Sequence, residues 1–340
     1  MEADFQNGWL YEAGIGENRA LRLEHGELVS VRVERGQKGT RQGAIVDAQF
    51  TRQWVAGQSG IITLESGEQC LLQPLPKGLT EGASLRVEIV REALNEKDGQ
   101  SKRAKARPVA NEIELTAGPS LLERIEKDGQ PIQDVHAHGP DLLAGFGWKE
   151  AMEQAETGRI EFDGGTLLVS LTPAMTVIDV DGPLAPFELA KRAAQYIALA
   201  LTRFDIGGSI GIDFPTLSTK AERTEVCAIF DAYMAGNCER TAINGFGFMQ
   251  IVRRKTGPSV LEVAQADKVL TATLALLRQA ERSAAGAGSL QLNVHPAVAT
   301  KLHHRQVWLD ELSKRTGRNV LVEASGNISI TGGHIASVSP

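Results

Sequence analysis

The segment from residue 166 to residue 214 constrains the fold most, because its apolar residues change from a two-residue period to a helical period and back. TLLVSL and MTVIDV alternate as strands do, FELAKRAAQYIALALTRF has helical spacing, and SIGIDF is typical of a buried strand. A strand, a helix and a second strand in succession predict a parallel strand pair with the helix packed on one face. We therefore expect a layered α/β core here.

The other segments indicate further compact units, so the predicted fold class is a multidomain mixture of α+β and α/β parts. Residues 1–36 alternate as a β-hairpin. Residues 37–108 contain short strands between Gly, Pro and polar turns, which predicts a small five-stranded barrel of the S1/OB type. Residues 109–148 contain a short helix and a strand, and residues 262–340 resemble a small α+β domain. In this last part we predict one helix over residues 300–317 and a final strand over 328–335.

Three acids stand at the ends of two predicted core strands: Asp179 and Asp181 in VIDVDG, and Asp213 in GIDF. Because side chains alternate along a strand, Asp179 and Asp181 share one face, and Asp213 joins them if its strand is the neighbour. Carboxylates this close repel unless a cation joins them, and their oxygens suit Mg²⁺, with Mn²⁺ as the alternative. These acids therefore predict a metal site for a phosphodiester substrate. The alternative is that Asp181 and Asp213 only close turns, which explains Asp179, inside an apolar run, less well.

The overall charge does not attract nucleic acid, since the net charge is -6 and the sequence pI is about 5.7. Binding must come from local basic groups, of which two occur: Lys102, Arg103, Lys105 and Arg107 at the end of the predicted barrel, and Arg253, Arg254 and Lys255 after the strand FGFMQIV. The first group is predicted to bind phosphates, with a solvated loop as the alternative. The second group is also predicted to bind a phosphate, on its position alone. Of the aromatic side chains in the barrel, Phe50 and Trp54 are the candidates for base stacking.

Several site classes are excluded by the residues present. Cys70, Cys227 and Cys238 never occur as Cys-x-x-Cys, so we expect neither a disulfide framework nor zinc, and a reducing cytoplasmic setting. No apolar run approaches the roughly 20 residues that span a bilayer, so we expect no membrane insertion. A phosphate-binding P-loop and a recognisable Ser or Cys nucleophile are also missing.

Three successive blocks resemble the core of the ribonuclease E/G family: GGTLLVSLTPAMTVIDVDG, FELAKRAAQYIALALTRFDIGGSIGIDF and INGFGFMQIVRRKTGPSV. The likeness covers roughly residues 151–260 with good specificity and extends weakly over the rest. It implies that Asp179 and Asp213 are magnesium ligands, and that Asp181 occupies the place of an asparagine that supports the catalytic aspartate. All three are therefore assigned a catalytic role.

The resemblance also implies a division into domains. Residues 1–36 and 109–148 would form an RNase H-like subdomain, with the S1/OB-like RNA-binding barrel of residues 37–108 inserted between them. A DNase I-like catalytic domain would span residues 149–261, and a small C-terminal domain residues 262–340. The 5′-end sensor has no room between the barrel and residue 121, and the zinc-link cysteines are absent, so no zinc-linked dimer is carried over and the oligomeric state stays open.

Four departures from the family pattern bear on activity: Ser170 and Pro173 replace acids, Gly245 replaces an arginine, and Gln250 replaces a glutamate. The leading hypothesis is a Mg²⁺-dependent endoribonuclease that hydrolyses single-stranded RNA, such as messenger or ribosomal RNA precursors, to 5′-phosphate products. The alternatives are an RNA-binding or ribosome-associated protein with weak or lost nuclease activity, motivated by these departures, and a phosphodiesterase acting on DNA or a small nucleotide.

Overall fold

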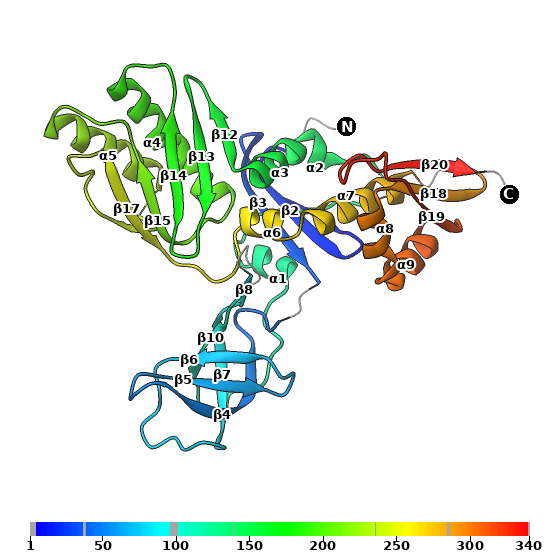
Figure 1. The fold of residues 1–340 in the computed structure, drawn as a ribbon, viewed down its shortest axis with the longest axis horizontal. Helices are drawn as coiled ribbons and strands as arrows, with labels where there is room; N and C mark the ends of the chain where they lie inside the picture. Colours follow the sequence, from blue (N-terminus) through cyan, green and yellow to red (C-terminus); the bar gives the residue numbers. More distant parts are fainter. Residues whose placement is uncertain are drawn as a thin grey trace. The chain divides into compact units, whose positions relative to one another are not determined.

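The computed structural model describes residues 5–36, 39–95, 101–137, 139–234, 236–283 and 286–338. These residues form a mixed α/β structure, which confirms the predicted class (Figure 1). The chain divides into two compact units, each assembled from separate stretches of sequence. The first consists of Met1–Gly36, Ile125–Glu156 and Val263–Pro340, and the second of Gln37–Arg124 and Thr157–Glu262.

The predicted barrel is confirmed in the second unit as a closed sheet of five strands in the order β10-β6-β5-β4-β7. Alternate apolar side chains fill its interior, among them Ile62, Leu72 and Val87. A two-stranded ladder, β8-β9, precedes its last strand. The strands of this part are β4 (Ile45–Val55), β5 (Ser59–Leu64), β6 (Gln69–Leu72), β7 (Ser84–Arg91), β8 (Leu94–Asn95), β9 (Ser101–Lys102) and β10 (Ala104–Pro108).

The second unit also contains a six-stranded sheet in the order β12-β13-β14-β15-β17-β16 (Figure 1). Only β14 and β15 are parallel, joined by α4 as the strand-helix-strand pattern predicts, whereas the other neighbours are antiparallel. The elements are β12 (Arg159–Phe162), β13 (Gly165–Leu171), β14 (Thr176–Asp181), α4 (Pro186–Arg203), β15 (Gly208–Asp213), α5 (Lys220–Met234), β16 (Glu239–Arg240) and β17 (Phe248–Arg253).

The first unit contains two smaller sheets, with strand orders β11-β1-β2-β3 and β19-β18-β20. The N-terminal hairpin thus gains a parallel partner from residues more than a hundred positions later, since Leu10 pairs with Gln133. The strands are β1 (Gly8–Ala13), β2 (Glu17–Glu24), β3 (Glu27–Arg35), β11 (Ile132–Asp134), β18 (Ser289–Val294), β19 (Val320–Ala324) and β20 (His334–Val338). The remaining helices are α1 (Leu121–Glu126), α2 (Leu142–Gly145), α3 (Trp148–Thr157), α6 (Val260–Ala266), α7 (Lys268–Arg282), α8 (Pro296–His303) and α9 (Gln306–Thr316).

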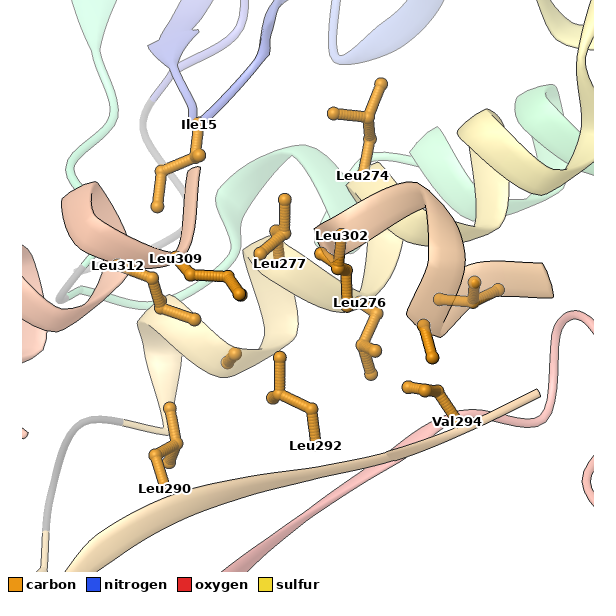
Figure 2. Close-up of a cluster of buried hydrophobic side chains, with 13 residues drawn as sticks. Ile15, Leu274, Leu276, Leu277, Leu290, Leu292, Val294, Leu302, Leu309 and Leu312 are labelled. Atoms are coloured by element: carbon orange, nitrogen blue, oxygen red, sulfur yellow. The ribbon is translucent and has the colours of Figure 1, made fainter. Parts of the chain in front are cut away.

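The C-terminal part of the first unit packs its core around α7 (Figure 2). Leu274 and Leu277 of this helix lie with Leu292 of β18 and Leu309 of α9 in one buried cluster. Ile15, from the turn between β1 and β2, inserts into the same cluster. The N-terminal hairpin and the C-terminal helices therefore share apolar burial.

A buried ion-pair network joins the same two segments. Arg19 is 1% exposed and contacts Glu12 at 2.9 Å and Asp141 at 2.8 Å. Glu17 is 3% exposed and pairs with Arg35 at 2.7 Å and with Arg278 of α7. Charges buried in this way are tolerated only because each has a partner, so removing one side leaves an uncompensated charge.

Two predicted elements of the last part are corrected. The helix expected over residues 300–317 is broken into α8 and α9 around Arg305, although no proline or glycine marks the break. The helical hydrogen-bond ladder stops there, because the amide N–H of Arg305 donates to the carbonyl of Leu302, three residues back, and Leu302 and Leu309 both lie in the cluster around α7. The final strand lies at His334–Val338 rather than over 328–335, because turns occupy the residues before Gly333. In the described part of the chain, no helix is both long and apolar enough to cross a membrane.

Glu17→Gln is expected to destabilise the protein by about 3 kcal/mol near neutral pH, because Arg35 and Arg278 lose their buried carboxylate. Burial alone would raise the pKa of Glu17, but the charges of Arg278 and Arg35 hold this pKa below its usual 4.5. A depressed pKa in the folded state means that the stabilisation is present above the unfolded pKa and is lost as the pH falls. The difference in unfolding free energy between wild type and variant should therefore shrink below about pH 4.5, measured by urea unfolding. A difference that does not change with pH would contradict this role of Glu17.

Candidate metal centre

The six-stranded sheet has one face covered by helices and one open face. In β14, Ile178 is buried whereas Asp179 and Asp181 are exposed, as strand alternation requires. Helix α4 packs against β13 and β14, and α5 packs against α4, so both belong to the covered side (Figure 1). We call the other side the open face, and by register it carries Leu168, Ser170, Val177, Asp179, Asp181, Gly211, Asp213, Phe248, Gln250 and Val252.

Asp179 and Asp213 are partners in the parallel register of β14 and β15. Register partners on adjacent strands point to the same face, with backbones about 4.8 Å apart. Both side chains are exposed, and within the residues that the structure describes neither makes a hydrogen bond or an ion pair. Two uncompensated carboxylates at this spacing repel each other and favour a cation between them. This donor set fits a hard divalent ion.

The third predicted acid, Asp181, lies one step further along the open face. Its register partner is Thr166 of β13, and β15 ends before reaching its level. Among the described residues, no group of three His, Cys, Asp or Glu side chains is close enough to hold one ion. The expectation that three acids converge is therefore reduced to the pair Asp179 and Asp213, and further ligands of an ion there would be waters or substrate oxygens.

Half-buried apolar side chains flank the carboxylate pair. Leu168 is the partner of Asp179 on β13, and Phe248 is the partner of Asp213 on β17. The Phe248 ring covers Gly211, because a Cβ at Gly211 would come within 2.6 Å of the ring and 3.1 Å of the Met175 sulfur. Glycine at position 211 therefore lets the ring lie against the sheet beside Asp213.

A tight turn leads into β17 next to Asp213. The side-chain oxygen of Asn244 accepts the amide N–H groups of Phe246 at 2.8 Å and Phe248 at 3.1 Å. The carbonyl of Gly247 accepts the amide N–H of Phe214, the residue after Asp213, at 3.1 Å. Gly247 has φ +95°, and a Cβ there would lie 2.2 Å from the Phe214 carbonyl oxygen, so only glycine fits. The turn presents Phe246, whose side chain is 87% exposed.

Two of the three basic residues predicted at the end of β17 have partners within the protein. Arg253 donates to the carbonyls of Leu201 at 3.0 Å and Ile206 at 2.9 Å, closing the end of α4. Lys255 pairs with both carboxylate oxygens of Glu262, at 2.6 and 2.7 Å. Arg254 is exposed, and so it is the one of the three whose placement suits a phosphate.

The predicted basic group of the barrel lies on its last strand and just before it. Ala104–Pro108 form strand β10, so this part is not a loop. Lys102 donates to the carbonyl of Pro173, Lys105 is half-buried, and Arg107 pairs with Glu88 at 2.6 Å. Arg103 lies 5.6 Å from the ring centre of Trp54, and its charge is exposed. Lys105 and Arg107 alternate with the buried Ala104 and Ala106, so both point out of the barrel, and the four residues stay the predicted phosphate-binding group.

Trp54 provides the aromatic surface of the barrel. It is 54% exposed, and the guanidinium groups of Arg52 and Arg103 each lie 5.6 Å from its ring centre. Phe50 is 2% exposed and packs in the barrel core, so it cannot stack on a base. Arg52 was missed from the sequence, although its position two residues before Trp54 places it on the same side of β4. Phe246 was also missed, since the sequence shows a turn there but not its exposure.

Two of the four residues that differ from the ribonuclease E/G pattern lie on the open face. Ser170 pairs with Val177, and Gln250 pairs with Gly211, so both are in the row next to the carboxylate pair. Pro173 lies in the turn between β13 and β14, and Gly245 lies in the turn before β17. The open face is therefore less acidic near Asp179 and Asp213 than the family pattern predicts.

Comparison with known proteins gives one matching family. The sequence pattern described as the Ribonuclease E/G family matches residues 73–256, a range that includes both carboxylates. Ribonuclease G of Salmonella typhimurium (strain SL1344) is 27% identical over 168 residues, which cover 44% of this chain and 32% of that protein.

Other relatives match to a similar extent. Ribonuclease G of Escherichia coli (strain K12) is 26% identical over 160 residues, covering 43% of this chain and 31% of that protein. Ribonuclease G of Haemophilus influenzae (strain Rd) is 28% identical over 160 residues, covering 43% of this chain and 30% of that protein. The matched stretch thus spans less than a third of the length of each of these curated relatives.

Gly211→Ala is expected to cost about 1–3 kcal/mol of stability and to displace the Phe248 ring, because the added Cβ overlaps it. Urea unfolding measures the first effect. Gly245→Ala is the matched control, since position 245 has open space and no positive φ. Equal stability of the two variants would show that the ring does not lie against Gly211.

Proposed function

The chain belongs to the ribonuclease E/G family, and we propose that it is an endoribonuclease that hydrolyses single-stranded RNA at the pair Asp179 and Asp213. The observation that carries this proposal is the register of β14 and β15, which places two unpaired carboxylates side by side on an exposed face. Ribonuclease G is the name of the relatives that match this part of the chain. An exposed site on an open sheet suits a polymeric substrate that must approach from solvent.

Asp179 and Asp213 would hold a divalent ion, Mg²⁺ or alternatively Mn²⁺. The chemistry that such an ion supplies is activation of water as the nucleophile and neutralisation of charge on the phosphate. The two carboxylates would orient such an ion, and Leu168 and Phe248 lie beside them on the neighbouring strands. Attack of water on phosphorus with departure of the 3′-oxygen leaves a 3′-hydroxyl and a 5′-phosphate. Asp181, two residues further along the same face of β14, would orient a ligand of the ion through a hydrogen bond.

The barrel would hold the RNA chain away from the cleavage position. Trp54 offers a ring for base stacking, and Arg52 and Arg103 place positive charge beside that ring. These groups favour unpaired RNA, because a base inside a duplex cannot stack on a protein side chain. They also give a local attraction that the net charge of -6 does not provide.

A second function is favoured by the departures on the open face. Ser170 and Gln250 put neutral side chains where the family pattern has acids, and no third acidic ligand is grouped with the pair among the described residues. These observations support an RNA-binding protein whose nuclease activity is weak or lost. It retains the surface at Trp54 but does not need the carboxylates.

Asp179→Asn and Asp213→Asn are each expected to reduce RNA cleavage at least about a hundredfold, because one of the two protein ligands of the ion is lost. EDTA should abolish cleavage by the wild type, and added Mg²⁺ should restore it. The measurement is the initial rate on a labelled single-stranded RNA.

The matched control is Glu225→Gln, which removes an exposed carboxylate on α5 and should leave the rate unchanged. If both aspartate variants cut as fast as the wild type, the proposed site is wrong. If the wild type binds RNA but does not cut it with Mg²⁺ or Mn²⁺, the second function is correct.

Trp54→Ala is expected to weaken binding of single-stranded RNA about tenfold, because one base loses its stacking partner. Fluorescence anisotropy at several salt concentrations measures the affinity. The salt dependence should stay the same for Trp54→Ala and decrease for Arg103→Ala, because only the second variant removes a charge. Val55→Ala, at the neighbouring exposed position, is the control. Equal affinities of Trp54→Ala and Val55→Ala would rule out stacking on Trp54.

A further inference from the structure

Phe246 is the most exposed of the large hydrophobic side chains in the described residues, at 87%. The preceding residues Asn244 and Gly245 are exposed and not apolar, and Phe246 is the one exposed large hydrophobic side chain that the structure describes between residues 234 and 251. A protein partner would need a larger contiguous apolar surface than one ring. A single planar ligand is the occupant that such a ring fits.

The turn that carries Phe246 is held in place by three hydrogen bonds that backbone N–H groups donate to Asn244. Asn244 accepts the amide N–H groups of Phe246 and Phe248 through its side chain, and the amide N–H of Gly247 at 3.2 Å through its carbonyl. The close approach of Gly247 to the Phe214 carbonyl leaves no space for a side chain. The exposed ring is therefore presented on a rigid support, which lowers the entropy cost of binding.

The support is attached directly to the carboxylate site. Phe214, which pairs with Gly247, is the residue after Asp213, and Phe248 is the register partner of Asp213. Phe246 thus lies beside the end of β15 that carries the carboxylate. A nucleotide whose phosphate contacts the Asp179 and Asp213 site would therefore lie next to the turn that presents this ring.

We propose that Phe246 is the stacking surface for one unpaired RNA base adjacent to the phosphate that is cut. The inference rests on the proposed function and adds a substrate-binding residue to it. Stacking on Phe246 would make the cleavage site itself select single-stranded RNA, because a paired base cannot stack on the ring. Phe248, which is half-buried against Gly211, forms the floor of this site and does not stack.

The test uses RNA oligonucleotides of one sequence in which a single abasic position is moved across the cleavage site. The wild type should lose about tenfold in kcat/KM when the base next to the cut is missing, since stacking on one aromatic ring has this size. Phe246→Ala should lose the same factor on intact RNA and should not respond to the abasic position. Phe246→Trp should keep both the rate and the response.

Val307→Ala is the control, because Val307 is 68% exposed on α9, far from β17 in sequence. Unchanged thermal unfolding of Phe246→Ala shows that the loss is not a folding defect. Full activity of Phe246→Ala, or a loss that adds to that of the abasic position, overturns the inference while the proposed function stands. If the wild type binds RNA without cutting it, binding affinity is measured with the same RNA series and variants. Full affinity of Phe246→Ala, or a loss of affinity that adds to that of the abasic position, then overturns the inference. Absence of both binding and cutting overturns the inference together with the proposed function.

Discussion

The in-register parallel pairing of β14 and β15 is the constraint on which the candidate site depends. It places Asp179 beside Asp213, and the connection through α4 covers the opposite face of the sheet, so the carboxylates stay in contact with solvent. A shift of one residue in either strand would turn one carboxylate toward the helices, where an ionised group is costly. The buried Ile178 and Ile212 flank the two aspartates and oppose such a shift, because it would expose them.

The two units differ in whether the charged side chains discussed above have partners of opposite charge. In the first unit, Glu12, Glu17 and Arg19 are buried, and each is neutralised by a partner from a distant segment, so these charges help to specify how the N-terminal hairpin joins α7. On the open face of the second unit, Asp179 and Asp213 are exposed without partners among the described residues. Exposed carboxylates without partners stay available to a divalent ion, as the proposed function requires.

The surfaces proposed to bind RNA are small and local. Trp54 with Arg52 and Arg103 on the barrel, and Phe246 beside β15, each offer one aromatic ring, and neither surface is strongly basic. Affinity built from stacking varies less with salt than affinity built from phosphate contacts, because stacking releases no counterions. This is consistent with a chain whose net charge is -6.

Much of the local structure could be predicted from the sequence, because periodicity reports backbone geometry directly. The two-residue period around Asp179 and Asp181 predicts their common face, the short segments after residue 37 predict the barrel, and the helix between β14 and β15 predicts their parallel pairing. Membership of the ribonuclease E/G family could also be read from the motifs, since strand and helix order is preserved in them. The RNase H-like and DNase I-like descriptions of the parts remain predictions.

The use of individual side chains was decided by tertiary structure. In the sequence, Arg253 and Lys255 are both candidates to bind a phosphate. In the fold, Arg253 donates hydrogen bonds to carbonyls of residues about fifty positions away. Lys255 pairs with the carboxylate of Glu262 in α6. Phe50 and Trp54 lie on the same strand, but Phe50 packs in the barrel core, whereas Trp54, after the register shifts that interrupt the strand, is exposed. The sequence by itself determined which residues form strands and helices, which share a face, and where the two aspartates stand. Only the fold decided which charged side chains and aromatic rings remain available to a ligand, because residues from distant segments pair with or bury the others.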